Sequence, residues 1–217
     1  MDTTTATDLG IDVSDARLGG TLAVPPGATS LVLFANGSGS SRFSPRNLYV
    51  ADVLNAGGVA TLLFDLLTAR EGERDEIDAS LRFDIPLLAR RLCEVADWAG
   101  VDERTRDLPM GMFGASTGAA AALMCAGFRP ERVKAVVSRG GRPDLAGPAL
   151  QTVTAPTLLI VGSEDGLVLG LNEQAKALMI APCRLEIVPG ATHLFEEPGA
   201  LDHVSRLALD WFRQHLR

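Results

Sequence analysis

A serine stands in the middle of Gly114–Gly118, which reads Gly-Ala-Ser-Thr-Gly and fits the pattern G-x-S-x-G. The pattern lies between an expected strand over residues 108–113 and an expected alanine-rich helix over residues 117–126. Small residues two positions before and after the serine let the strand and the helix approach closely. The helix N-terminus would bring backbone N–H groups and the positive end of its dipole to a reacting carbonyl. The sequence therefore predicts that Ser116 is a nucleophile rather than an inert residue of a glycine-rich turn.

A serine nucleophile needs a general base, and the chain offers only three histidines. His203 and His215 fall in an expected C-terminal helix over residues 201–216, where a surface histidine is ordinary. His193 instead ends the loop Pro-Gly-Ala-Thr-His, which follows an expected strand over residues 184–188. We therefore expect His193 to be the base.

The base in turn needs an acid that orients it, and the segment Gly162–Gly166 offers two. This segment reads Gly-Ser-Glu-Asp-Gly and follows an expected strand over residues 157–161. Asp165 is preferred to Glu164 because the orienting acid usually emerges at the fourth position after the strand. Asp144 is a weaker candidate, because capping a short helix is its more ordinary role.

The negative charge that develops on a reacting carbonyl oxygen needs two backbone N–H donors. Thr117, the residue after the nucleophile, is expected to supply one. The other is expected from the loop Asn36–Ser40, Asn-Gly-Ser-Gly-Ser, which follows an expected strand over residues 31–35. Ser38 is the first choice and Gly37 the second, and the sequence leaves both open.

Arginines gather in two of the loops that follow strands: Arg42 and Arg46 in one, Arg139 and Arg142 in the other. They could recognise a carboxylate or a phosphate on a substrate. Solvated loop charges, or partners of Asp144, Asp65 or Glu196, are the more ordinary interpretation of these arginines. The candidate substrate-binding residues are Asn36, Gly37, Arg42, Arg139 and Arg142.

Short apolar runs alternate with helical patterns along the chain. Expected strands cover residues 21–24, 31–35, 59–64, 108–113, 134–138, 157–161 and 184–188, and expected helices cover 44–55, 83–99, 117–126, 172–180 and 201–216. This alternation predicts an α/β fold with a mainly parallel sheet and helices on both faces. Ligands of such sheets bind at the carboxyl ends of the strands, where the loops described above would meet. A further strand over residues 9–13 would pair through a turn near Gly19 and Gly20. The charged residues 68–80 are expected to form an exposed loop or the start of a helix.

Length and composition exclude several classes of protein. The 217 residues carry a net charge of −7, which argues against a nucleic-acid partner. No apolar run is long enough to cross a membrane, and Met1–Asp15 lacks the features of a secretory signal. Cys93, Cys125 and Cys183 are odd in number and widely spaced, so neither a disulfide framework nor a metal site is expected. We expect one cytoplasmic domain over residues 1–217, with residues 1–8 as a flexible tail.

Over about residues 20–216 the chain resembles the α/β-hydrolase superfamily, and within it the small, lidless group similar to dienelactone hydrolases. The motifs that carry this resemblance are Asn36-Gly37-Ser38, Gly114–Gly118, Val161–Asp165 and Gly190–His193. It implies an α/β-hydrolase fold without a separate cap domain and a hydrolase of small-molecule esters, thioesters or lactones. It implies no metal and no cofactor, and a monomer or homodimer.

The chain departs from that family pattern at two positions. Many relatives have His-Gly where this chain has Asn36-Gly37, and dienelactone hydrolases proper use cysteine where this chain has Ser116. The second difference favours ordinary ester or thioester chemistry over a dienelactone substrate.

Other functions compete with ester hydrolysis. The same three catalytic residues could transfer an acyl group, and a hydrolase fold can serve as a ligand receptor without catalysis. The strand and glycines of residues 31–39, followed by Asp65, are also similar in outline to a dinucleotide-binding unit. That interpretation fails because Arg42 occupies the third glycine position and the helix begins too late.

Overall fold

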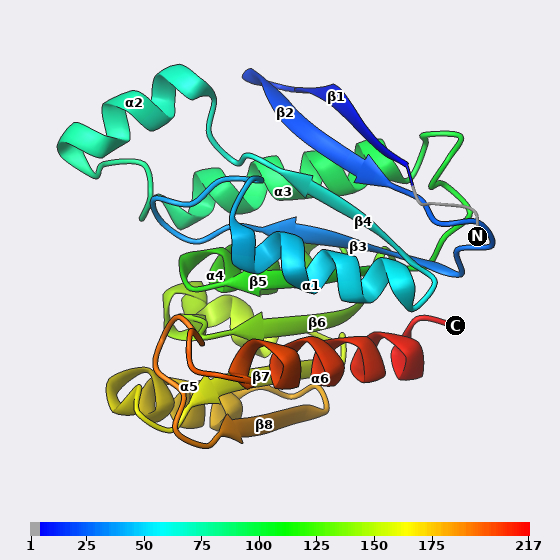
Figure 1. Cartoon of the computed structure of the whole chain (residues 1–217). Coiled ribbons are helices and arrows are strands. Elements are labelled where there is room, and N and C mark those ends of the chain that lie inside the picture. Colours follow the sequence, from blue (N-terminus) through cyan, green and yellow to red (C-terminus); the bar gives the residue numbers. More distant parts are fainter. Residues whose placement is uncertain (1–4) are drawn as a thin grey trace.

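A single eight-stranded sheet forms the centre of the molecule, with the strand order β1-β2-β4-β3-β5-β6-β7-β8 (Figure 1). The structure is a computed structural model, and it describes residues 5–217. The strands are β1 (Ala6–Val13), β2 (Ala16–Ala23), β3 (Ser30–Ala35), β4 (Val59–Phe64), β5 (Met110–Ala115), β6 (Val133–Arg139), β7 (Thr157–Gly162) and β8 (Cys183–Val188). β1 and β2 are antiparallel, β2 is antiparallel to β4, and β3 to β8 are parallel. The expected mainly parallel sheet is confirmed.

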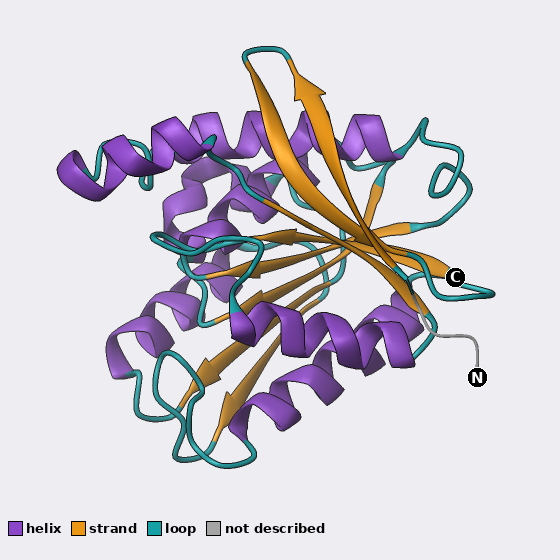
Figure 2. Ribbon diagram, turned by 45° about the horizontal axis from the view of Figure 1, so that its top comes forward, coloured by secondary structure: helices purple, strands orange, loops and turns teal. Residues whose placement is uncertain are grey.

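Helices cover both faces of this sheet (Figure 2). α1 (Pro45–Ala56) and α6 (Ala200–His215) pack together on one face. On the other face lie α3 (Ile85–Ala99), α4 (Thr117–Phe128), α5 (Gly166–Leu178) and the short 3₁₀ helix η1 (Pro143–Gln151). Only η1 stands between β6 and β7, so no cap domain is inserted there.

The apolar core is divided by the sheet into two halves. Leu33 and Met112 point to the side of α3 and α4, whereas Phe34 and Phe113 point to the side of α1 and α6. The rings of Phe34 and Phe113 lie 4.9 Å apart. Because both faces of β3, β4 and β5 are buried, these strands are continuous apolar runs instead of alternating patterns.

The N-terminal hairpin differs from its expected form. β1 begins at Ala6, and the turn to β2 lies at Ser14 and Asp15, not near Gly19 and Gly20. The expected tail over residues 1–8 is therefore wrong for residues 6–8, and residues 1–4 lie outside the described part. Edge strand β1 exposes most of its side chains, which explains why its sequence is polar.

The charged segment after β4 forms a true helix, α2 (Ala69–Asp78), which projects from the body of the molecule (Figure 1). Thr68 and Glu71 start it with reciprocal hydrogen bonds between side chains and backbone, a capping box. α5 also differs from expectation, because it begins at Gly166 and not at residue 172. Among residues 5–217, no helix combines the length and the apolar character that a membrane span requires.

Candidate active site

Ser116 occupies the sharp turn between β5 and α4, at the edge of the sheet where the parallel strands end. Its φ of 50° and ψ of −122° form a backbone conformation that residues with a side chain rarely adopt. The turn is tight, since a Cβ added at Gly118 would stand 2.2 Å from the carbonyl oxygen of Ala35. The local geometry is the one that the G-x-S-x-G pattern requires.

Asp165 and His193 are joined by a hydrogen bond of 2.6 Å between Oδ2 of Asp165 and Nδ1 of His193. Asp165 directly precedes α5, and His193 lies in the loop after β8. Glu164 instead accepts a hydrogen bond of 3.0 Å from the Ser163 hydroxyl, and Asp144 pairs with Arg142. Among the three acids considered, the structure brings Asp165 alone to the histidine.

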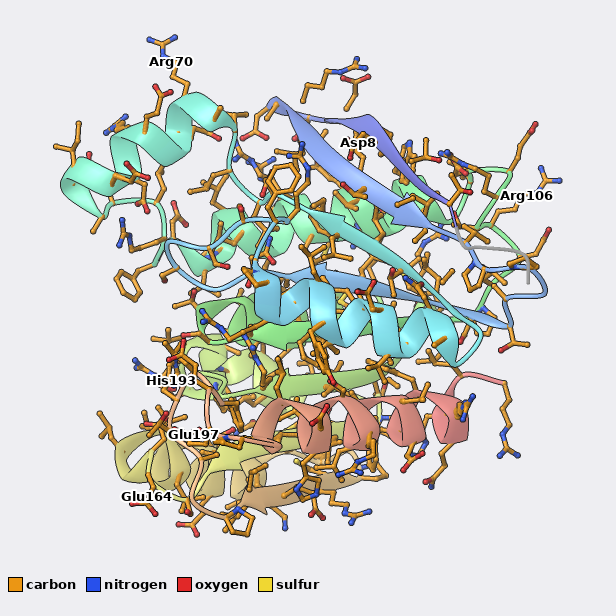
Figure 3. All side chains as sticks on the ribbon, in the orientation of Figure 1. Asp8, Arg70, Arg106, Glu164, His193 and Glu197 are labelled. Carbon is orange, nitrogen blue, oxygen red and sulfur yellow. The ribbon has the colours of Figure 1, made fainter. Side chains whose placement is uncertain are left out.

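The loop after β6 contacts both Ser116 and His193. The N–H of Ser116 donates to the Arg139 carbonyl at 3.2 Å, and the N–H of Arg142 donates to the Ser116 carbonyl at 3.0 Å. A Cβ built on Gly140 would stand 3.5 Å from Cε1 of His193. Within residues 5–217 no hydrogen bond joins the Ser116 hydroxyl to the imidazole ring, and such bonds are often long in free enzymes. Figure 3 shows His193 at this edge of the molecule, opposite Arg106.

The loop after β3 passes directly against the serine. A Cβ added at Gly37 would stand 2.9 Å from Cβ of Ser116, so only glycine fits this approach. In the described part of the chain, the N–H groups of Gly37, Ser38 and Thr117 donate to no protein acceptor. The hydroxyls of Ser38 and Thr117 lie 2.9 Å apart and tie this loop to α4. Three N–H groups near Ser116 are therefore available, and the choice between Gly37 and Ser38 stays open.

The side chain of Asn36 is buried and forms two hydrogen bonds within the protein. Its amide nitrogen donates to the Phe64 carbonyl at 2.9 Å, and its oxygen accepts from the Asn47 amide at 2.6 Å. Asn36 therefore fastens the loop to β4 and α1, and because it also lines the pocket described below, its place among the candidate substrate-binding residues stays a prediction. Sequence reasoning missed Asn47, whose only signal is a polar residue near the start of the expected helix 44–55.

Three of the four arginines in the loops form ion pairs with nearby acids. Arg42 pairs with Asp65, Arg46 with Glu196 at 3.0 Å, and Arg142 with Asp144 at 2.7 Å. For Arg42, Arg46 and Arg142 the structure therefore shows the pairing with an acid that the sequence analysis offered as the alternative to a substrate anion. Arg139 alone has no such partner among residues 5–217.

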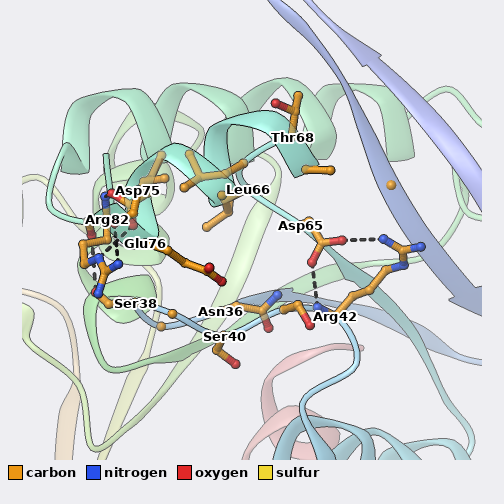
Figure 4. A pocket seen from close by; sticks show the side chains of 18 of the residues that line it. Asn36, Ser38, Ser40, Arg42, Asp65, Leu66, Thr68, Asp75, Glu76 and Arg82 are labelled. Carbon is orange, nitrogen blue, oxygen red and sulfur yellow. Dashed lines mark hydrogen bonds and ion pairs between the residues drawn. The ribbon is translucent and has the colours of Figure 1, made fainter. Parts of the chain in front are cut away.

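A pocket of about 650 Å³ adjoins the loop after β3 (Figure 4). Residues 36–43 form one wall, and residues 65–76 together with Arg82 form the other. Ser38 and Thr117 also line the pocket. An ion pair of 2.7 Å between Arg82 and Asp75 holds the second wall. Sequence reasoning missed this wall, because a charged segment gives no sign of what it packs against.

Metal-binding side chains do not form a site in residues 5–217. No group of three or more His, Cys, Asp or Glu side chains there is arranged to hold a metal ion. Cys93 and Cys125 are buried between α3 and α4, with their sulfur atoms 2.8 Å apart. Burial raises the pKa of the Cys183 thiol to about 11.

Some solved structures resemble this chain in both sequence and fold, and others resemble it in fold alone. No protein-family model matches it. A crystal structure of dienelactone hydrolase from Anabaena variabilis is 55% identical, with a TM-score of 0.97 and 99% of each chain covered. Est1E from Butyrivibrio proteoclasticus shares the fold, with 17% identity, a TM-score of 0.79, and 95% of this chain and 98% of that chain covered.

Two curated Mycobacterium tuberculosis proteins, which carry the provisional name phosphoribosyl transferase, are 57% identical over 197 residues. The match covers 91% of this chain and 44% of theirs, so the chain spans less than half of their length. The near-complete match to the Anabaena protein covers every loop of the site described above. The chain belongs to the dienelactone hydrolase family and has the α/β-hydrolase fold.

Proposed function

We propose that this protein is a serine hydrolase that cleaves carboxylic esters, including thioesters or lactones, through an acyl-enzyme on Ser116. The observation that carries the proposal is the 2.6 Å hydrogen bond between Asp165 and His193, held against the loop that also contacts Ser116. Membership of a hydrolase family supports the reaction class. A serine in place of the cysteine of dienelactone hydrolases proper favours ordinary esters over a dienelactone.

The proposed reaction begins when Oγ of Ser116 attacks the ester carbonyl and His193 takes the serine proton. Asp165 orients the imidazole through Nδ1 and stabilises the imidazolium that forms. The N–H of Thr117 and an N–H of Ser38 or Gly37 bind the oxyanion. Collapse of the tetrahedral intermediate breaks the bond to the leaving alcohol, which receives the proton from His193.

The acyl-enzyme is then hydrolysed by the same groups in reverse roles. His193 takes a proton from water, and the resulting hydroxide attacks the acyl carbonyl. The second tetrahedral intermediate releases the carboxylic acid, and Ser116 recovers its proton from His193. Each turnover consumes one ester and one water and requires no cofactor.

The first test compares wild type with Ser116→Ala on p-nitrophenyl acetate and butyrate. We expect kcat to fall on the order of 10⁴-fold or more, because the three catalytic residues act as a unit. A fluorophosphonate should label Ser116, as located by mass spectrometry. Ser80→Ala, which removes an exposed hydroxyl from the loop after α2, is the matched control and should keep wild-type turnover.

Each other result has a defined meaning. Labelling of Ser116 without turnover would still identify Ser116 as a competent nucleophile. It would mean that the enzyme accepts a narrower range of acyl groups than the two test esters provide. An ester or amide product formed with added alcohol or amine would identify an acyltransferase. Neither labelling nor turnover would favour a receptor with a hydrolase fold.

The transferase name of the Mycobacterium tuberculosis relatives does not change this proposal. Those proteins are more than twice as long as the region that matches this chain, and the matching region has the α/β-hydrolase fold. We therefore propose hydrolysis, and not phosphoribosyl transfer, as the reaction of this chain.

A further inference from the structure

Cys93 of α3 and Cys125 of α4 form a pair of thiols in the apolar core, with their sulfur atoms 2.8 Å apart. Both cysteines are free, and they are 4% and 0% exposed. Sulfur atoms in a disulfide lie about 2.05 Å apart, so forming the bond would bring these two atoms closer by less than about 1 Å. The proposed ester hydrolysis uses neither thiol, so the pair has no role in it.

The packing of α3 against α4 explains why two cysteines 32 residues apart in the sequence meet. Ala89 and Ala96 lie one turn before and after Cys93 on the same face of α3, and Ala121 lies one turn before Cys125 on α4. All five residues belong to one buried cluster. Small side chains on both faces let the two helices approach closely, which brings the sulfur atoms together.

One member of the pair can be reached from the surface. Cys93 lines a pocket of about 290 Å³ whose other lining residues include Arg90, Met124 and Arg129. Cys125 is not among the residues that line this pocket. A small oxidant in the pocket therefore meets Cys93 first and has Cys125 directly behind it.

The surroundings of the pair favour the same order of reaction. The hydrogen bond to Cys125, together with the charge of Arg129, lowers the pKa of Cys93 against the opposing effects of burial, Asp97 and Glu94. The same hydrogen bond and burial raise the pKa of Cys125, which therefore keeps its proton. Because the thiolate is the form that attacks oxidants, Cys93 is the attacking sulfur and Cys125 the resolving one.

We propose that Cys93 and Cys125 are a modification site, which a peroxide oxidises reversibly to a disulfide between α3 and α4. With hydrogen peroxide, the Cys93 thiolate attacks one oxygen, the O–O bond breaks, and the departing hydroxide takes a proton and becomes water. Cys93 is then a sulfenic acid. The Cys125 sulfur attacks the Cys93 sulfur, the S–O bond breaks, and the departing hydroxide takes the Cys125 proton and becomes a second water. The two thiols lose two electrons, which reduce the peroxide.

The bond would cross-link the segment that carries the proposed nucleophile. The loop closed over residues 93–125 contains β5 and the turn at Ser116. A cross-link stabilises a protein mainly by restricting its unfolded chain, so oxidation should raise Tm by about 5–10 °C. This inference goes beyond the proposed hydrolase function and does not depend on it.

The test treats the reduced full chain with hydrogen peroxide at neutral pH and follows it by mass spectrometry. Alkylation with iodoacetamide in denaturant marks the thiols that remain free. We expect the intact protein to lose the mass of two hydrogens, the peptides of Cys93 and Cys125 to be cross-linked, and Cys183 to be alkylated. Dithiothreitol should restore all three thiols. Cys183 should react at least about tenfold more slowly than Cys93, because burial raises its pKa to about 11.

Four variants separate the cross-link from other effects of oxidation. Cys93→Ala and Cys125→Ala each remove one partner, and both should abolish the cross-link and the rise in Tm. Cys183→Ala is the matched control and should keep both. Ser116→Ala should form the disulfide as wild type does, which separates this result from the test of the hydrolase proposal. Circular dichroism of each reduced variant reports whether it folds.

Several results would overturn the proposal. One is a stable sulfinic or sulfonic acid on Cys93 while Cys125 stays unmodified. Others are oxidation of Cys183 before Cys93, or three free thiols after peroxide treatment. A cross-link that leaves Tm unchanged would overturn its stabilising effect.

Discussion

Ser116 and Phe195 hold backbone conformations that side chains normally avoid, with φ values of 50° and 56°. Each such residue costs on the order of 1–3 kcal/mol, and the surrounding structure must offset that cost. Ser116 is the proposed nucleophile, and Phe195 follows the proposed base by two positions with its ring fully buried. Two of the three non-glycine residues with positive φ among residues 5–217 therefore lie at or near the proposed reacting groups, and the third, Ala79, ends α2.

Asp165→Asn tests the role of the acid. The substituted amide would keep a polar partner near Nδ1 of His193 but would favour the wrong tautomer, so kcat should fall by about 10³- to 10⁴-fold. Hydrolysis of p-nitrophenyl butyrate and circular dichroism would separate a catalytic from a folding defect. Glu164→Gln is the neighbouring control, because Glu164 contacts Ser163 and not His193. A large loss in Glu164→Gln with a mild effect in Asp165→Asn would reverse the assignment.

The proposed catalytic residues can be predicted from the sequence, but most of the residues that hold them in place cannot. Ser116, Asp165 and His193 could be predicted because each follows a strand, and a parallel sheet brings such positions together. Asn47 could not be assigned a role, because its partner Asn36 comes from the loop after β3. The difference between a paired Arg142 and an unpaired Arg139 is visible only when the acids are in place.

Arg91 of α3 is the buried link between three elements of the molecule. Its side chain is 1% exposed and donates to the Leu66 carbonyl at 2.9 Å, to Glu71 of α2 at 2.8 Å and to Asp15 of the β1–β2 turn at 3.1 Å. Arg91 thus holds the hairpin and the outer wall of the pocket against α3. Neither α2 nor the turn has a comparable apolar anchor, because Asp75 is the one buried residue of α2.

Arg91→Leu should lower the free energy of unfolding by about 1–3 kcal/mol, because it removes charge-assisted hydrogen bonds to Glu71 and Asp15 and leaves the Leu66 carbonyl without this donor. Urea denaturation followed by fluorescence measures the change. Arg90→Leu is the matched control at the next position. Arg90 also contacts Asp15 but is 42% exposed, so its loss should cost less than about 1 kcal/mol. Equal effects of the two substitutions would contradict the role given to Arg91.

Low pH should weaken the ion pair between Arg91 and Glu71. The hydrogen bonds from Arg91 lower the pKa of Glu71 from its ordinary 4.5 to about 2, against the opposing effect of burial. A pKa that is lower in the folded state stabilises the protein above the unfolded pKa, and this contribution is lost as pH falls from about 5 toward 2. Urea midpoints at pH 7, 5 and 3 should therefore decline more steeply in wild type than in Glu71→Gln. Parallel declines would exclude Glu71 as a source of acid sensitivity.

Element boundaries agree with the sequence to within one residue for β3 and β4, whose apolar runs have no exposed face. β5 begins and ends two residues later than expected, and β2 begins five residues earlier than expected. β1 was missed in part, because an edge strand with solvent on most of its side chains looks like a polar tail. α5 begins six residues before its expected start, and Leu167 in its first turn is an exposed apolar residue.

At the scale of the whole molecule, the parallel arrangement of the strands explains why residues from five loops lie close together. The loops after β3, β5, β6, β7 and β8 all lie at one edge of the sheet, so residues from 37 to 193 meet there. The proposed nucleophile lies at the end of β5, a central strand, and the proposed acid and base follow strands toward one edge. This arrangement places the proposed nucleophile after a fully buried strand and the proposed base after the edge strand β8.

We therefore expect amide hydrogen exchange to be slow in the buried central strands and fast in the outer elements. Amides of β3, β5 and β6 should exchange last, because both faces of these strands are covered and both edges are paired. Amides of β1 and α2 should exchange first, since β1 is an edge strand and α2 buries almost nothing. Mass spectrometry of exchanged peptides measures this order, and Arg91→Leu should accelerate exchange in β1 and α2 before it affects β5. If Arg91→Leu instead accelerated amide exchange equally in all strands, the hairpin and α2 would unfold together with the core. Arg91 would then stabilise the whole domain and not only its two outer elements.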